Sequence, residues 1–139
     1  IDTSLINPAS ISGTVKSIGK TEASFDFTYS TPGMAFFQLS KCGPVQTLQY
    51  IKNMLRNNSF SDLEVTTNDC YQRYFTRVLD DNGTHYTLDV TGLTPETVYT
   101  LYVYFENQVK NSNANKPLKF TFITQCKRLG IFSLLIFFS

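Results

Sequence analysis

His85 carries the single imidazole of the chain, and it is therefore the first candidate for proton transfer near neutral pH. The alternation of residue types around it places His85 on the same strand face as Thr87 and Asp89, opposite Tyr86 and Leu88. A Ser-His-Asp triad also needs an oriented nucleophile and an oxyanion hole, and the chain has no G-x-S-x-G motif. We therefore expect His85 to be a solvated strand residue and the protein not to be an enzyme.

The acidic turn Asp80-Asp81-Asn82 offers oxygen atoms of the kind that Ca²⁺ prefers. The sequence has no second acidic cluster and no C-x-x-C pair, so neither a calcium nor a zinc site is predicted. The dipeptide Asn82-Gly83 tolerates the positive φ of a tight hairpin turn, which is the simpler interpretation of this stretch. We expect no metal and no cofactor.

Three cysteines and two glycosylation sequons indicate in which cellular compartment the protein resides. Cys42 and Cys70 form either a disulfide or two buried thiols. Cys126 is then free, palmitoylated beside a membrane, or paired with another chain. The sequons Asn57-Asn58-Ser59 and Asn82-Gly83-Thr84 make Asn57 and Asn82 candidate glycosylation sites. Together these features favour an extracellular or cell-surface protein of the secretory pathway.

Composition predicts a single folded domain rich in β-strands. The chain has 139 residues, 42% of them hydrophobic, with 12 Phe and 8 Tyr that suit half-buried strands. A net charge of +1 provides no basic surface that would attract a nucleic acid. Alternating or largely apolar runs predict seven strands, near 11–16, 22–29, 34–39, 70–79, 85–91, 99–105 and 118–123.

The stretch 43–69 interrupts this pattern. Val45, Leu48, Ile51 and Leu55 recur at helical spacing, and Pro44 suits the first turn of a helix. We therefore expect an amphipathic helix inside an insertion between the middle strands.

The segment Leu93-Thr94-Pro95-Glu96-Thr97-Val98-Tyr99 precedes an alternating strand. Its Leu-x-Pro-x-Thr-x-Tyr pattern resembles the start of the sixth strand of a fibronectin type III domain. The resemblance implies an all-β sandwich of seven strands over residues 9–126, after a linker at 1–8. It also implies a tyrosine corner made by Leu93, Pro95 and Tyr99. Domains of this family occur in tandem in large surface proteins, so a structural or adhesion module that mediates protein–protein assembly is the expected function.

Two interpretations of the aromatic and apolar residues on the outer sheet face stay open. Tyr102, Tyr104 and Ile123 form a contact surface for other protein chains or for copies of this chain, or the inserted helix covers them. The alternative function is a carbohydrate or small-ligand binding module that uses the loops beside Asn82 and at Asn107–Pro117, with exposed aromatic rings that stack on sugars.

The C-terminal segment 127–139 is apolar but shorter than the roughly 20 residues that a membrane-spanning helix needs. It is the beginning of a membrane helix, a segment packed on this domain or a neighbouring copy, or a disordered end. The first interpretation would make the protein a membrane-anchored accessory subunit of a larger complex. The apolar residues of this tail are Leu129, Ile131, Phe132, Leu134, Leu135, Ile136, Phe137 and Phe138.

Overall fold

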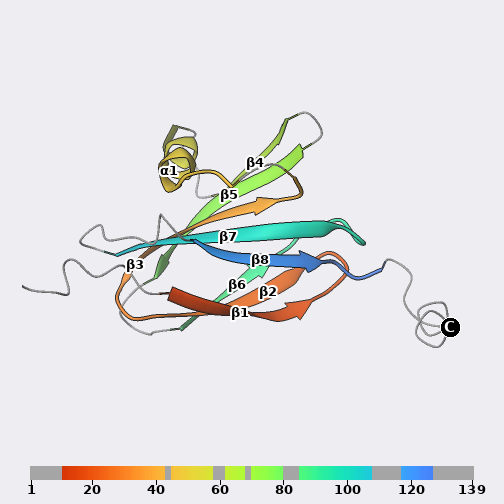
Figure 1. The fold of residues 1–139 in the computed structure, drawn as a ribbon, viewed down its shortest axis with the longest axis horizontal. Helices are drawn as coiled ribbons and strands as arrows, with labels where there is room; N and C mark the ends of the chain where they lie inside the picture. Colours follow the sequence, from red (N-terminus) through yellow and green to blue (C-terminus); the bar gives the residue numbers. More distant parts are fainter. Residues whose placement is uncertain are drawn as a thin grey trace, which may run out of the picture.

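The computed structural model describes residues 11–42, 45–57, 62–67, 70–79, 85–107 and 117–126, and these form two antiparallel β-sheets and one helix (Figure 1). The smaller sheet has the order β1-β2-β6 and consists of β1 (Ile11–Ile18), β2 (Ala23–Tyr29) and β6 (His85–Val90). The larger sheet has the order β4-β5-β3-β7-β8 and consists of β4 (Asp62–Thr67), β5 (Cys70–Leu79), β3 (Gly33–Ser40), β7 (Val98–Asn107) and β8 (Leu118–Ile123). The helix α1 spans Leu48–Asn57.

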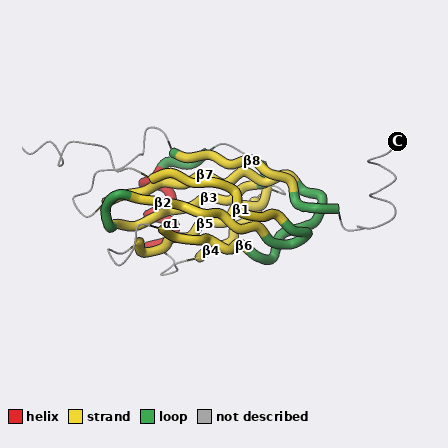
Figure 2. Tube along the Cα trace, turned by 90° about the horizontal axis from the view of Figure 1, so that it is seen from below, coloured by secondary structure: helices red, strands yellow, loops and turns green. Residues whose placement is uncertain are grey.

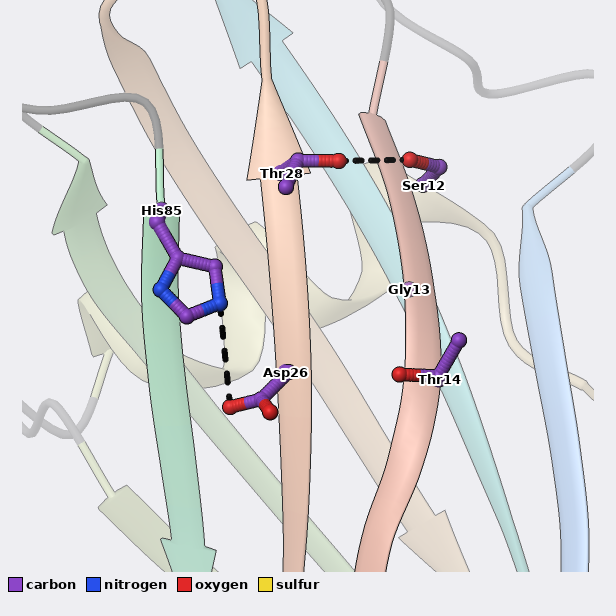
Figure 3. A pocket seen from close by; sticks show the side chains of 6 residues that line it. All are labelled: Ser12, Gly13, Thr14, Asp26, Thr28 and His85. Carbon is purple, nitrogen blue, oxygen red and sulfur yellow. Dashed lines mark hydrogen bonds and ion pairs between the residues drawn. The ribbon is translucent and has the colours of Figure 1, made fainter.

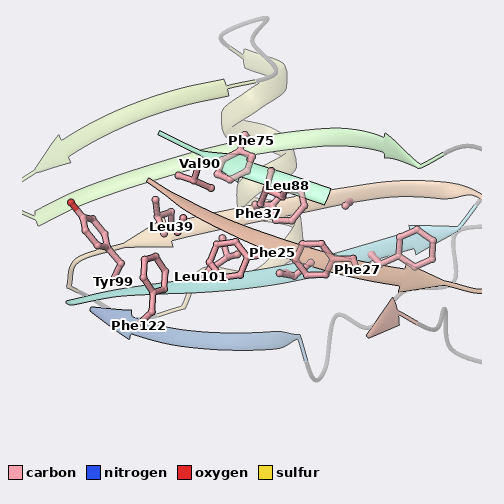
Figure 4. Close-up of a cluster of buried hydrophobic side chains, with 14 of the residues drawn as sticks. Phe25, Phe27, Phe37, Leu39, Phe75, Leu88, Val90, Tyr99, Leu101 and Phe122 are labelled. Carbon is pink, nitrogen blue, oxygen red and sulfur yellow. The ribbon is translucent and has the colours of Figure 1, made fainter. Parts of the chain in front are cut away.

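The core lies between the two sheets because each strand buries alternate side chains. On β2, Ala23, Phe25, Phe27 and Tyr29 are buried, while the residues between them are half-buried or exposed. Aromatic rings fill much of this space, as Figure 4 shows, and the rings of Phe37 and Phe75 stack at 4.8 Å between centroids. The strands of both sheets run along the long axis of the molecule (Figure 2), as expected for an aligned sandwich.

The described residues contain eight strands, one more than the seven that the sequence predicted. The additional strand, β4, lies in the second half of the stretch expected to be an insertion. It pairs antiparallel with β5, and Arg73 on β5 adds a side-chain contact, because its guanidinium donates to both carboxylate oxygens of Asp62 at 3.0 and 2.8 Å. The predicted helix is present, and the hydroxyl of Thr47 caps its first turn by accepting from the N–H of Tyr50 at 3.1 Å.

The loop before β7 has the geometry of a tyrosine corner. Tyr99 is buried, and its hydroxyl accepts a hydrogen bond from the backbone N–H of Thr94 at 2.9 Å. Leu93 is also buried beneath this loop. A residue that the sequence did not single out, Thr124, adds two bonds: its hydroxyl donates to the Thr94 carbonyl at 2.6 Å and accepts from the Thr97 N–H at 2.9 Å.

Candidate functional site

The outer face of the larger sheet is partly covered by α1. Leu48, Ile51 and Leu55 on the helix pack against Phe36, Tyr74 and Tyr104 on the strands, and we call these six residues the cap cluster. All six have 7% or less of their surface exposed. Their burial removes the central aromatic side chains of this face from contact with solvent.

Polar contacts and a disulfide hold the helical segment on the sheet. The disulfide joins Cys42 to Cys70, as the first of the two interpretations predicted, and its Cα atoms are 5.6 Å apart. The buried Gln38 accepts from the N–H of Gln46 at 2.7 Å, and the Tyr104 hydroxyl donates to the Gln46 carbonyl at 2.6 Å. These bonds satisfy polar groups that the helical segment would otherwise bury without partners.

The middle of α1 is held on the sheet by charge. Lys52 pairs with Glu106 at 3.1 Å, and its ammonium group lies 5.8 Å from the centroid of the Phe36 ring. The segment is therefore attached at the disulfide, at Gln46 and at Lys52.

Burial under the helix raises the pKa values of two tyrosines. Desolvation raises the pKa of Tyr74 to about 12, and the neighbouring Tyr50 contributes to the rise. Desolvation likewise raises the pKa of Tyr104. Outside the cap cluster, desolvation raises the pKa of Tyr71 to about 12, with a further contribution from the carboxylate of Glu64, to which its hydroxyl donates at 3.1 Å.

The three residues expected to form a contact surface have different environments. Tyr104 points to the predicted face but lies under the helix with 3% of its surface exposed, whereas Ile123 is 58% exposed. Tyr102 is half-buried, with the ammonium group of Lys119 6.0 Å from its ring centroid. Val98, which is paired with Ile123 across β7 and β8, is 52% exposed. We call Val98, Tyr102, Lys119 and Ile123 the uncovered strip.

The outer face of the smaller sheet is polar and contains a shallow hollow of about 310 Å³ (Figure 3). Strand register arranges its side chains in two rows. One row is Ser12, Thr28 and His85, and the other is Thr14, Asp26 and Thr87. The first five of these, together with the backbone of β1 at Gly13, line the hollow, and Thr87 borders it through a bond to Asp26.

Hydrogen bonds link neighbouring strands across this hollow. The hydroxyls of Ser12 and Thr28 are 2.7 Å apart, and the Thr87 hydroxyl donates to Asp26 Oδ1 at 2.7 Å. His85 Nε2 lies 3.8 Å from the same Asp26 oxygen. The alternation of residue types in the sequence correctly places His85 on the same strand face as Thr87 and Asp89. It gives no indication that Asp26 lies near His85, because their proximity depends on the pairing of β2 with β6.

This arrangement differs from a catalytic triad. Within the described residues, the only polar contact of His85 is with Asp26, and no hydroxyl of the hollow is hydrogen-bonded to the imidazole. A Ser-His-Asp triad contains such a hydroxyl–imidazole bond. The described part of the chain also has no group of three His, Cys, Asp or Glu side chains that could hold a metal ion.

The remaining predicted sites lie only partly within the described residues. The sulfur of Cys126 lies 3.0 Å from Glu96 Oε1. The Asn57 backbone ends α1, while the Asn57 side chain, the turn 80–84 with Asn82, the stretch 108–116 and the tail 127–139 lie outside the described residues. In the part of the chain that the structure describes, no helix has the length and apolarity needed to cross a membrane.

Comparison with known proteins gives little further information. No protein-family model matches the chain, and no curated protein matches it. Among solved structures, the sensor domain of the anti-sigma factor RsgI4 of Pseudobacteroides cellulosolvens is similar, with 15% sequence identity and a TM-score of 0.43. The alignment covers 87% of this chain and 98% of that domain. A similarity this weak carries no argument about function.

Proposed function

We propose that this chain is a non-catalytic, extracellular module of the fibronectin type III type that assembles with a second copy of itself through β8 and the uncovered strip. Two antiparallel sheets and the bond from Thr94 to Tyr99 support the assignment to that type of sandwich. The Cys42–Cys70 disulfide supports an oxidising, extracellular environment.

The observation that carries the assembly proposal is the exposure of Val98 and Ile123. They are paired across β7 and β8, and more than half of each side chain's surface is in contact with solvent. The helix covers the centre of the same sheet face, so these residues are the apolar part of β7 and β8 that remains accessible there. A pair of adjacent apolar side chains beside a sheet edge suits a contact with another strand.

The edge itself favours a second copy of the chain as the partner. β8 pairs with β7 alone, so one of its backbone edges has no strand partner within the described residues. Lys119 is the only charged residue of β8, and the chain as a whole has a net charge of +1. Two copies can therefore approach each other without strong repulsion, and pairing of their β8 strands would extend the larger sheet.

Two of the other edge strands, β1 and β4, carry features that oppose such pairing. In β1 the register shifts between Val15 and Ser17, and Lys16 occupies the bulge. In β4, Asp62 and Glu64 alternate with apolar residues. Bulges and charges of this kind protect sheet edges from association.

Sedimentation velocity of the purified chain over a wide concentration range tests the proposal. We expect reversible dimers that Ile123→Asp weakens at least about tenfold, equivalent to ~1.4 kcal/mol. Val78→Asp is the matched control, because Val78 is 69% exposed at the opposite side of the same sheet. Circular dichroism establishes that both variants are folded. A chain that stays monomeric, or equal weakening by both substitutions, would contradict the assembly proposal.

A further inference from the structure

The polar hollow on the smaller sheet is separate from the surface proposed for assembly. It lies over β1, β2 and β6, whereas the uncovered strip belongs to β7 and β8 in the other sheet (Figures 1 and 3). Its two rows of side chains lie on adjacent outward positions of the strands, roughly 7 Å apart. Extended strands in a hydrogen-bonded sheet hold these groups more rigidly than a loop would.

Several hydrogen-bonding groups in the hollow remain available to a ligand. Asp26 uses Oδ1 to accept from Thr87, and Oδ2 has no partner among the described residues. The hydroxyl of Thr14 likewise has no bond to any described residue. In the pair formed by Ser12 and Thr28, one hydroxyl donates to the other, so the acceptor's hydrogen is free to donate elsewhere. The imidazole of His85 is 57% exposed and adds a further polar group.

This lining excludes several ligand classes. Its side chains include no Lys or Arg, and its one carboxylate would repel a phosphate or sulfate. They also include no large aliphatic side chain and no Phe, Tyr or Trp, so the hollow offers little apolar surface to a lipid or an apolar peptide. A single carboxylate is a poor site for Ca²⁺, which is usually held by several carboxylate and carbonyl oxygens.

We propose that the hollow binds a neutral carbohydrate, with one sugar ring lying across the two rows. The Asp26 carboxylate accepts from sugar hydroxyls, and Thr14, the Ser12–Thr28 pair and His85 donate to or accept from neighbouring hydroxyls. A sugar presents several groups that both donate and accept, which matches this mixture of hydroxyl, carboxylate and imidazole. The volume of about 310 Å³ is at the lower end of the range for small-ligand sites.

The chemistry of the hollow also sets the expected strength of binding. Hydrogen bonds to an open surface replace bonds to water, so each contributes only a modest net free energy. The lining has no Phe, Tyr or Trp ring on which a sugar could stack. We therefore expect a dissociation constant of about 1 mM for a single ring.

The proposal is tested by two-dimensional amide NMR of the ¹⁵N-labelled chain during titration with the methyl glycosides of glucose, galactose, mannose and N-acetylglucosamine. At least one glycoside should give saturable shifts confined to the amides of β1, β2 and β6 around the hollow. The absence of saturable shifts with all four glycosides, or shifts spread over both sheets, would overturn the proposal.

Substitutions identify the groups responsible. Asp26→Asn removes the charge but keeps the size, and Thr14→Val removes a hydroxyl that has no described partner within the chain. Each should weaken binding at least about fivefold, within the range for one hydrogen bond. Asp89→Asn is the matched control, because Asp89 is on the same sheet face but bonds to Ser24 outside the hollow. Equal weakening by Asp26→Asn and Asp89→Asn would refute the assignment of the site.

Discussion

Tyr99 illustrates how one hydroxyl can order a loop from within the core. Its ring stacks on Phe122 with 5.8 Å between centroids, while its hydroxyl reaches back to the N–H of Thr94. Thr124 binds the same loop from β8's C-terminal side, through Thr94 and Thr97. The corner is thus fixed by two side chains whose bonds are short and lie mostly out of solvent.

Tyr99→Phe tests the contribution of this hydroxyl. The substitution keeps the buried ring and leaves the Thr94 N–H without its partner, so we expect the free energy of unfolding to fall by about 1 kcal/mol. For a chain of this size that corresponds to a melting temperature lower by about 4 °C.

Guanidinium denaturation and thermal melting measure the effect. Tyr86→Phe is a suitable control, because Tyr86 packs against the core but no hydrogen bond of its hydroxyl to a described residue is present. Similar losses in both variants would mean that the corner bond contributes nothing specific.

Sequence alone could identify some of these residues but not others. Leu93, Pro95 and Tyr99 are close in sequence and follow a local pattern, so the order of residue types is enough to recognise them. Thr124 and Asp26 take their contacts from strands far away in the chain, and no local signal indicates such partners. These contacts depend on strand register, which a single sequence does not specify.

At the scale of elements, the disulfide and α1 act together. Cys42 lies two residues after the end of β3 and Cys70 begins β5, so the bond closes the segment that contains the helix and β4. Closing a loop of 28 residues removes conformational freedom mainly from the unfolded chain. The helix is therefore kept close to the sheet that its apolar face covers.

Replacing both cysteines, Cys42→Ser with Cys70→Ser, should lower the free energy of unfolding by about 3–4 kcal/mol in the chain-entropy model. Amide hydrogen exchange should accelerate more in α1 than in β2, because the helix loses its covalent attachment while the core between the sheets is retained. Cys126→Ser is the control and should change neither quantity. If amide hydrogen exchange accelerated equally in α1 and in β2, the disulfide would act only on global stability and not locally on the helix.

The elements differ in how far sequence could predict them. The strict alternation in β2 matches its observed burial, and the helical spacing of Leu48, Ile51 and Leu55 matches the face that packs on the sheet. β4 was missed because its six residues, DLEVTT, give a short signal within a stretch already interpreted as an insertion. The sequence leaves open whether the helix covers the aromatic face, because its docking depends on long-range contacts such as that of Tyr104 with Gln46.

At the scale of the whole molecule, the described residues present three kinds of surface. α1 covers the centre of the larger sheet, the uncovered strip lies beside the open edge of β8, and the smaller sheet displays polar side chains to solvent. The two proposed contacts therefore use different sheets. If both proposals hold, the module joins protein assembly at the edge of one sheet to recognition of a carbohydrate on the other.

Stability at high pH is also a property of the whole molecule, because it sums over every group whose pKa changes on folding. Burial raises the pKa of Tyr71 and Tyr74 to about 12 from an ordinary value of 10.0, and it raises that of Tyr104 as well. Below pH 10 these phenols are protonated in both states. Between about pH 10 and about pH 12 the unfolded chain releases their protons while the folded chain retains them, so unfolding is favoured as the pH rises.

We therefore expect the free energy of unfolding, measured by guanidinium denaturation, to fall as the pH increases from about 10 towards 12. Tyr74→Phe should make this fall less steep, because Phe has no proton to release in the unfolded chain. Leu63→Ala is the control: Leu63 packs against the cap cluster, so its truncation destabilises the same region without removing a phenol. The Leu63 variant should keep the pH dependence of the unsubstituted chain. A Tyr74 variant with an unchanged slope would show that this buried phenol does not contribute to the alkaline loss of stability.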